Sequence, residues 1–488
     1  MKVVTIDPIT RLEGHGKISI FLNEEGNVEN AYLQIPELRG FERFCQGRRA
    51  EDMPQITSRI CGVCPVAHHF ASTKALDAAF NIDPPSVAKK LRELMYCGYI
   101  IYDHTLHFYY LGGPDFIVGP DTPPEKRNII GVIEKAGLEV GKEVIKHRAY
   151  GQKITAILGG KATHPVCGLP GGVSKGLNKE EIKEIEKMVL SCIEFAKFSL
   201  KIFDNIVLKN KKYVDFIKND AYQQSTYNMG LVDKNNKVNF YDGKIRVTDQ
   251  DGKEFLKFDV KDYYKYIAEH VEEWTFMKFP YIKEIGWKGF KDGKDSGIYR
   301  VGPLARLNAS EGMATTFADK EYKRFYETLG GKPVNSTVAF HWARLIELLY
   351  ASERAYELIK DPEITSQKVR NPVGKPGEGI GVVEAARGTL IHHYKLDKNG
   401  LIEKANLIVA TTNNAGAINM SIRNAAKGVI KKGNVDNATL NMVEMAFRAY
   451  DPCFACATHS LPGGLPLEIK IFDSNKKLYK ILKQNILG

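Results

Sequence analysis

Two Cys-x-x-Cys pairs, near opposite ends of the chain, constrain its fold more than any other feature. Cys61 and Cys64 form the first pair, Cys453 and Cys456 form the second, and Cys453 lies 389 positions after Cys64. A turn brings residues i and i+3 together, so the two sulfurs of each pair can face one centre. Four thiolates at one point suit a soft metal ion. If one ion takes both pairs, its site forms only in the folded core and joins the first and last parts of the chain.

The spacing alone leaves alternatives open. A structural zinc site uses the same four ligands. A thioredoxin-like dithiol needs only one pair, beside a βαβ pattern that the sequence does not show. The two pairs could also be unrelated. Four further cysteines have no close partner in the sequence and are expected to be buried thiols: Cys45, Cys97, Cys167 and Cys192.

The composition is that of a globular protein with a sizeable core. Of the 488 residues, 43% are hydrophobic and 26% are charged, which excludes a disordered or collagen-like chain. No apolar run reaches the roughly 18 residues of a membrane span. The net charge of +11 is mild for this length and favours a generally basic soluble protein over one that binds nucleic acid or an anionic membrane. Few cysteines and no secretory h-region indicate a cytoplasmic location.

Hydrophobic periodicity predicts an α+β, helix-dominated fold, with a large central helical bundle and small peripheral β-sheets. A capping-box pattern at Asn178 and Glu181 marks the start of one long helix. The expected segments are, in order, a β-hairpin at 17–35, helices near 66–80, 86–112, 124–157 and 178–215, an α/β surface excursion at about 220–300, helices at 318–360, β structure around 380–412 and a helix at about 417–449.

The residues around the two cysteine pairs closely resemble the two signatures of the large subunit of nickel–iron hydrogenases. The first signature is Arg59-Ile60-Cys61-Gly62-Val63-Cys64-Pro65, and the second is Asp451-Pro452-Cys453-Phe454-Ala455-Cys456, followed by His459. Within the family, the chain looks most like the cytosolic enzymes of methanogens that do not reduce deazaflavin and work with heterodisulfide reductase. Further motifs occur in the family's order, so the resemblance spans nearly the whole chain: Arg11-Leu12-Glu13-Gly14-His15, Arg39-Gly40-Phe41-Glu42, His104-Thr105-Leu106-His107 and Glu384-Ala385-Ala386-Arg387-Gly388.

The resemblance implies a nickel–iron centre and the reversible heterolytic cleavage of H2 into protons and electrons. Cys61 and Cys453 would be terminal nickel ligands, whereas Cys64 and Cys456 would bridge nickel to an iron that carries carbon monoxide and cyanide. The sequence has no cubane-type cysteine motif and no G-x-G-x-x-G signature. Electron transfer would therefore depend on partners, namely an iron–sulfur small subunit, a further electron-transfer subunit and a heterodisulfide reductase complex.

Five more residues take roles from the resemblance. Glu13 matches the family's proton-relay glutamate, and partial desolvation would raise its pKa toward neutrality. Arg387 matches the arginine that lies over the open face of the metals, and Asp115 and Asp451 match the acids that hold it. His68 follows Cys64 by one helical turn and matches a histidine that hydrogen-bonds a bridging sulfur. Without these motifs, each residue would be an ordinary ion-pair, turn or core residue.

The resemblance also implies a second metal site and a maturation step. Glu42 and His459 match ligands of a buried magnesium or iron ion, with a main-chain carbonyl near Leu407 as a third ligand. In the family, a maturation protease cuts directly after this histidine once nickel is in place. The mature protein would then be a single catalytic body at 1–459, and residues 460–488 would be a removable C-terminal extension. The alternative for this extension is an ordinary C-terminal hairpin or helix.

Two other functions remain open from the sequence. One is a related electron-transfer or quinone-reductase-like subunit without a nickel site, and the other is a zinc-stapled structural subunit. The presence of all four cysteines together with Glu13 and Arg387 favours the hydrogenase. One departure is Ala386, because the family often has proline before this arginine. This change bears on the rigidity of the loop and leaves the guanidinium unaffected.

Overall fold

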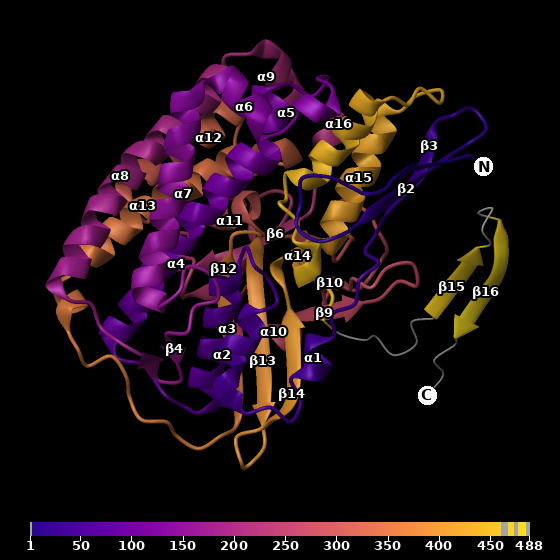
Figure 1. Cartoon of the computed structure of the whole chain (residues 1–488). Coiled ribbons are helices and arrows are strands. Elements are labelled where there is room, and N and C mark those ends of the chain that lie inside the picture. Colours follow the sequence, from indigo (N-terminus) through magenta and orange to yellow (C-terminus); the bar gives the residue numbers. More distant parts are fainter. Residues whose placement is uncertain (1, 460–466, 473–476, 485–488) are drawn as a thin grey trace.

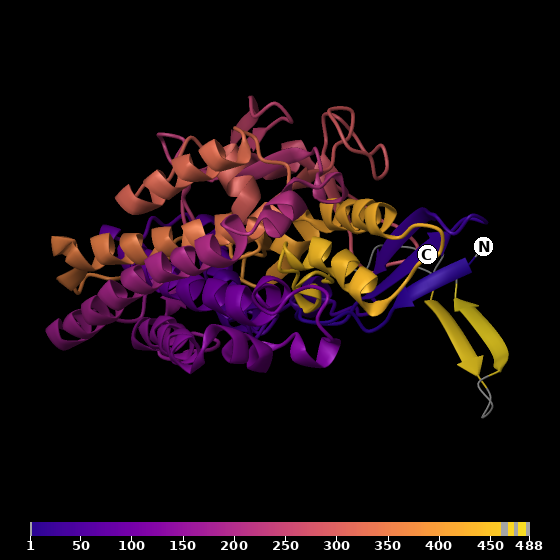
Figure 2. The same ribbon diagram turned by 90° about the horizontal axis from the view of Figure 1, so that it is seen from above.

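Long helices form the main body of the protein, and small sheets surround it (Figures 1 and 2). The computed structural model describes residues 2–459, 467–472 and 477–484. The helices are α1 (Phe41–Phe44), α2 (Met53–Ser58), α3 (Pro65–Ala79), α4 (Ser86–Leu106), α5 (Pro114–Ile117), α6 (Ile129–Ala136), α7 (Leu138–Gly159), α8 (Lys179–Phe203), α9 (Lys211–Lys218), α10 (Tyr263–Tyr266), α11 (Pro303–Ala309), α12 (Thr316–Leu329), α13 (Phe340–Lys360), α14 (Ala410–Asn413), α15 (Ala415–Val429) and α16 (Asn437–Arg448). The strands are β1 (Lys2–Ile6), β2 (Lys17–Leu22), β3 (Val28–Gln34), β4 (Gly168–Leu169), β5 (Gly172–Val173), β6 (Tyr227–Val232), β7 (Lys244–Thr248), β8 (Glu254–Asp259), β9 (Ile267–His270), β10 (Phe279–Ile282), β11 (Tyr299–Arg300), β12 (Glu378–Ala385), β13 (Gly388–Leu396), β14 (Ile402–Ile408), β15 (Leu467–Phe472) and β16 (Leu478–Gln484). The predicted α+β, helix-dominated fold is confirmed.

Helix α13 lies at the centre of the helical bundle. Of its 21 residues, 17 are buried, and it packs against α4, α8 and α12. A helix that is buried on all sides belongs to the core of a large protein. Helix α8 is amphipathic instead, with buried residues at three- and four-residue spacing from Ile185 to Phe203. It begins at the predicted capping box, in which Asn178 and Glu181 exchange side-chain-to-backbone hydrogen bonds.

Three of the predicted helices are interrupted, and the segment 124–157 folds mainly as α6 and α7 on either side of Gly137. The segment 417–449 folds as α15 and α16, which are separated where Lys432 and Gly433 both have positive φ. Helix α15 ends at Val429 because Ile430 has an extended conformation, and the two left-handed residues follow in the connection to α16. The segment 178–215 folds as α8, a π-helical stretch at Asp204–Leu208 and α9, whose start is capped by the side chain of Asn210.

The antiparallel meander β12–β13–β14 forms the β structure predicted around 380–412. Helix α3 packs directly on β12. A glycine permits this approach, because a Cβ added at Gly381 would lie 2.0 Å from the carbonyl oxygen of Ala71. Cys64 lies at the N-terminus of α3, and Arg387 lies in the turn between β12 and β13. The packing of these two elements therefore brings the first cysteine pair and the arginine together.

The remaining sheets lie around this body. The hairpin predicted at 17–35 corresponds to β2 and β3, and β1 adds a third antiparallel strand. The predicted α/β excursion contains a sheet in the order β11-β6-β7-β8 and the separate pair β9–β10. Across the described part of the chain, no helix is long and apolar enough to cross a membrane.

The predicted C-terminal extension begins after His459. Its first residues, 460–466, lie outside the described residues, as do 473–476 and 485–488. Strands β15 and β16 pair as an antiparallel hairpin, which lies apart from the helical body in both views (Figures 1 and 2). The predicted cleavage after His459 stays a prediction.

Candidate metal centre

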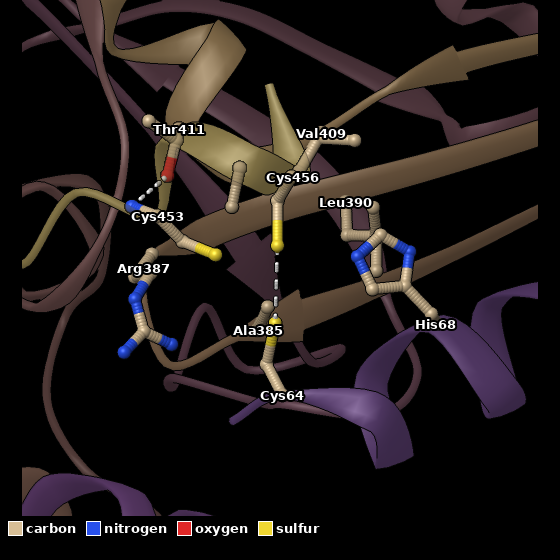
Figure 3. Close-up of a pocket in the computed structure, with 10 residues that line it drawn as sticks. Cys64, His68, Ala385, Arg387, Leu390, Val409, Thr411, Cys453 and Cys456 are labelled. Atoms are coloured by element: carbon tan, nitrogen blue, oxygen red, sulfur yellow. Dashed lines mark hydrogen bonds between the residues drawn. The ribbon is translucent and has the colours of Figure 1, made fainter. Parts of the chain in front are cut away.

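Four cysteine sulfurs meet in the interior of the protein. Cys61 and Cys64 lie between α2 and the start of α3, whereas Cys453 and Cys456 lie in a short segment after α16. All four side chains are buried, and their sulfurs lie within 4.8 Å of one another. The Sγ atoms of Cys61 and Cys453 are 3.5 Å apart. Those of Cys64 and Cys456 are 3.6 Å apart (Figure 3). Sulfurs that bind one ion at about 2.3 Å lie about 3.8 Å apart in a tetrahedron, so the cluster fits a thiolate-bound metal.

The surroundings of the sulfurs favour negative charge at one of them. The pKa of Cys61 lies well below its ordinary value because Cys453, Cys456 and Cys64 hydrogen-bond its thiolate. The backbone N–H groups of Val63 and Cys64 also donate to Cys61 Sγ, at 3.2 and 3.3 Å. Burial raises the pKa values of Cys453 and Cys456 well above the ordinary range. The two backbone N–H donors thus favour a thiolate at Cys61 Sγ.

Glu13 lies beside the second cysteine pair. Its Oε2 is 2.8 Å from the Sγ of Cys453. Its backbone carbonyl accepts a hydrogen bond from the N–H of Phe454 at 2.9 Å, which fixes the segment next to the cysteine. Burial raises the pKa of Glu13, and the charge of Cys61 acts in the same direction. The carboxylate is thus placed to exchange a proton with a sulfur of the site.

Arg387 reaches the same cavity from the turn between β12 and β13 (Figure 3). Its Nη1 lies 3.1 Å from Asp103 Oδ2, and its Nη2 lies 3.0 Å from Asp451 Oδ2. All three side chains are buried. Burial raises the pKa of Asp451 to about 7, although Arg387 and Arg344 act in the opposite direction. The predicted pairing of Arg387 with Asp451 is present in the structure.

The predicted pairing of Arg387 with Asp115 is wrong. The carboxylate of Asp115 lies 2.5 Å from Arg11 and 2.7 Å from Arg448, in a separate buried network. Asp103 takes its place beside Arg387, because α4 carries this residue against the turn. The sequence holds Asp103 directly before the motif that begins at His104, and this proximity was the only available signal for it.

His68 lines the cavity together with Cys64 and Cys456 (Figure 3). Its Nδ1 lies 3.1 Å from Nε2 of His392, and Nδ1 of His392 lies 2.7 Å from the hydroxyl of Tyr394. Burial lowers the pKa of His68 to about 4, so the ring is neutral at pH 7 in this environment. The ring thus pairs with a second histidine, and its predicted bond to a bridging sulfur stays a prediction.

A second cavity joins the residues expected to hold the hard cation. Glu42, Leu407 and His459 all line it. Both ring nitrogens of His459 are buried and have no hydrogen-bond partner among the described residues. One oxygen of Glu42 accepts the N–H of Leu407 at 2.8 Å. A carboxylate beside an unsatisfied buried imidazole fits a divalent cation, so the residues present suit the predicted magnesium or iron ion.

The structure adds residues that the sequence did not indicate. Glu269 on β9 and Lys278, directly before β10, also line the second cavity. Burial raises the pKa of Glu269. The hydroxyl of Thr411 accepts the N–H of Cys453 at 3.0 Å (Figure 3). These residues carry no motif, and only the packing of distant segments brings them to the two sites.

Comparison with known proteins agrees with this geometry. A model of the nickel-dependent hydrogenase family matches residues 39–119 and 142–459, and a HoxL-like model matches residues 3–38. The F420-non-reducing hydrogenase iron-sulfur subunit of Archaeoglobus profundus is 47% identical over 485 residues, which cover 99% of this chain and 100% of the relative. The vhu F420-non-reducing hydrogenase subunit of Methanocaldococcus jannaschii is 46% identical, with 88% of this chain and 100% of the relative covered.

Solved structures share the fold. The crystal structure of an NAD+-reducing [NiFe]-hydrogenase in the H2-reduced state superposes with a TM-score of 0.89 at 36% identity, and covers 94% of this chain and 100% of its own. The Ni-Fe-Se hydrogenase of Desulfovibrio vulgaris Hildenborough superposes with a TM-score of 0.77 at 26% identity, with the same shares covered. The chain therefore belongs to the nickel-dependent hydrogenase family, as the catalytic large subunit of a nickel–iron enzyme.

Proposed function

We propose that this large subunit cleaves H2 at a centre held by Cys61, Cys64, Cys453 and Cys456, with Glu13 as the proton relay. One observation carries the proposal: four buried sulfurs, a carboxylate 2.8 Å from one of them and a buried guanidinium converge on one cavity. Cys61 and Cys453 are the proposed terminal nickel ligands. Cys64 and Cys456 are the proposed bridges to an iron with carbon monoxide and cyanide ligands.

Each residue around this centre has its own proposed role. The nickel–iron group, when bound, supplies the soft redox-active site at which H2 is split. Glu13 Oε2 would take the proton from the direction of Cys453 Sγ and release it by rotating, and burial raises its pKa above that of an exposed glutamate. Arg387 is held by Asp103 and Asp451 and presents its remaining N–H donors to the cavity. His68 closes the opposite wall as a neutral ring.

The second cavity is proposed to hold magnesium or iron. Its support is the pair of unpartnered ring nitrogens on His459 beside the carboxylate of Glu42, among the residues that the structure describes. The ion would tie the last buried residue of the body to α1, which carries Glu42. A backbone hydrogen bond already joins Glu42 to His459, because the N–H of Glu42 donates to the carbonyl of His459 at 3.1 Å.

Removal of residues 460–488 by a protease is proposed as the maturation step. The family match ends at residue 459. The two solved relatives are covered over their full length by 94% of this chain, which is about 459 of its 488 residues. The family match therefore ends at His459, the proposed ligand of the second ion.

The electrons require partner subunits. Relatives are named as single subunits of larger hydrogenases, and this composition implies a small-subunit partner. We propose that this partner carries iron–sulfur clusters, and that electrons continue through a further electron-transfer subunit to a heterodisulfide reductase complex. We place the enzyme in the cytoplasm, because all eight cysteines are unpaired thiols, as expected in a reducing compartment.

Metal analysis and infrared spectroscopy of the natively purified complex test the proposed function. The expected result is one nickel per chain, infrared bands of iron-bound carbon monoxide and cyanide, and H2–D2 exchange. Zinc without these bands would instead identify a structural subunit. If the complex contained neither nickel nor zinc and showed no H2–D2 exchange, the chain would instead be a related electron-transfer subunit.

A further inference from the structure

Arg387 lies in a two-residue hairpin turn. Ala385 pairs with Gly388 at the end of the β12–β13 ladder, so only Ala386 and Arg387 connect the strands. Two-residue hairpin turns favour the I′ and II′ types, which need positive φ at the first central residue. Neither Ala386 nor Arg387 has a positive φ. The turn is therefore of neither primed type, its positive φ falls instead at Gly388, and contacts from outside the hairpin also reach it.

One support is a buried guanidinium. Arg306, on α11, donates to the carbonyl of Ala385 at 2.8 Å and to that of Ala386 at 3.3 Å. Arg306 is itself fixed, because Glu347 pairs with it through both carboxylate oxygens at 2.6 Å, and Glu384 lies 2.7 Å away. All three side chains are fully buried. A guanidinium in such a network cannot move without leaving a buried charge unpaired.

The second support is the hydroxyl of Tyr99. It accepts the N–H of Ala386 at 2.9 Å, from a fully buried position on α4. The same helix carries Asp103, one turn further on, which pairs with the guanidinium of Arg387. A third contact to the turn comes from Asn414, whose Nδ2 donates to the carbonyl of Arg387 at 3.2 Å. Helix α4 thus holds both the turn and the side chain that the turn presents.

We propose that Tyr99 is a positioning residue, which works with Arg306 to set the turn that aims Arg387 into the metal cavity. The proposal rests on the proposed function, because it assigns a purpose to the placement of Arg387. It also explains why residue 386 is alanine here and not proline. Only a residue with an N–H can bond the hydroxyl of Tyr99, and a proline here would place a ring carbon where that hydrogen lies, within the 2.9 Å gap to the oxygen.

A double-mutant cycle in the nickel-loaded complex tests the proposal. Tyr99→Phe leaves the N–H of Ala386 without its acceptor, so we expect H2–D2 exchange per nickel to fall about tenfold or more and the infrared bands of cyanide to shift. Ala386→Pro alone should also slow exchange, because its ring meets the Tyr99 hydroxyl. Adding Tyr99→Phe to Ala386→Pro should restore part of the rate. The effect of Tyr99→Phe thus reverses its sign between the two backgrounds.

Tyr109→Phe is the matched control. Tyr109 is equally buried, and its hydroxyl bonds Ser199 Oγ over the same 2.9 Å, away from the turn. It should leave exchange and the cyanide bands unchanged. If the proline variants do not load nickel, Tyr99→Phe is compared with Tyr109→Phe directly, with amide hydrogen exchange of the 384–388 peptide as a further readout.

Two outcomes would overturn the proposal. One is an equal change of rate from Tyr99→Phe in both backgrounds, and the other is Tyr99→Phe behaving like Tyr109→Phe in rate, bands and amide exchange. Failure of the proposed function gives a different result, since the unmodified complex would then lack nickel, the diatomic bands or exchange before any variant is made.

Discussion

The carboxylate of Glu13 lies 2.8 Å from the sulfur of Cys453, and the same two residues form an isolated parallel β-bridge. A side-chain contact and a backbone contact thus join the N-terminal segment to the last cysteine pair. Because burial raises the pKa of Glu13, its carboxyl can change protonation state nearer to neutral pH than an exposed glutamate. This pairing leads to the first prediction.

Glu13→Gln should keep the metals and slow H2–D2 exchange by about 100-fold or more, because glutamine keeps the shape of the side chain but cannot relay a proton. Exchange by mass spectrometry, normalised to nickel content, measures this effect. Glu37→Gln is the control, since Glu37 pairs with the exposed His15 outside the sulfur site. Exchange of Glu13→Gln at the unmodified rate would remove Glu13 from the relay.

Asp103→Asn and Asp115→Asn should have different consequences. The first weakens the hold on Arg387, so exchange per nickel should fall about tenfold and the cyanide bands should shift. The second leaves Arg11 and Arg448 without their shared carboxylate, which should cost about 3–5 kcal/mol of unfolding free energy while the rate per nickel changes little. Calorimetry and exchange on both variants check this division, and the reverse pattern would contradict it.

Glu42→Gln should lower the content of the second divalent ion without changing nickel, because it removes the charged oxygen ligand from the cavity around His459. Elemental analysis after gel filtration gives the measurement. Glu403→Gln is the control, since Glu403 is half exposed and pairs with Lys395 on the surface. Equal ion content in Glu42→Gln and unmodified protein would argue against the second site.

The intact mass of the nickel-loaded protein should lack the 29 residues 460–488, whereas protein made without nickel should keep them. Mass spectrometry of both preparations gives the answer directly. A nickel-loaded chain that retains the extension would refute the proposed maturation step.

The folded protein should lose stability as the pH falls from about 6.5 to 4. Burial lowers the pKa values of His69 and His104 to about 4 and that of His341 to about 3. Below the ordinary value of 6.5, the unfolded chain therefore binds protons that the folded chain excludes, and each histidine contributes a slope of about 1.4 kcal/mol per pH unit. Thermal unfolding across this range shows the loss.

His341→Phe should reduce this slope by one proton, because it removes one buried ring that must stay neutral. A flat stability profile between pH 6.5 and 4 would contradict the prediction.

The sequence predicted the parts of the site that lie within local motifs. The Cys-x-x-Cys pairs, Glu13 and Arg387 sit in short signatures, and the structure brings all of them together. Local sequence patterns could not decide between Asp103, which precedes the motif at His104, and Asp115, which follows it. Only the packing of the helices shows that Asp103 faces Arg387.

Local sequence patterns could not indicate the other residues that contribute to the two sites, for the same physical reason. Arg306 and Tyr99 act through main-chain atoms of a turn that lies 80 or more positions away in each case. Glu269 reaches the second cavity from the β9–β10 pair, a segment with no motif. Contacts of this kind depend on how distant elements pack, and hydrophobic periodicity predicts the elements but not their partners.

The distance between the cysteine pairs along the chain also has a consequence for synthesis. A ribosome that adds about 5–20 residues per second needs roughly 20–80 s to make the 389 positions between Cys64 and Cys453. Throughout that interval, Cys61 and Cys64 form a nascent dithiol without its counterpart, open to oxidation or to capture by a competing ion. A chain released before Cys453 carries only half of the ligand set, so a complete metal site shows that translation passed Cys456.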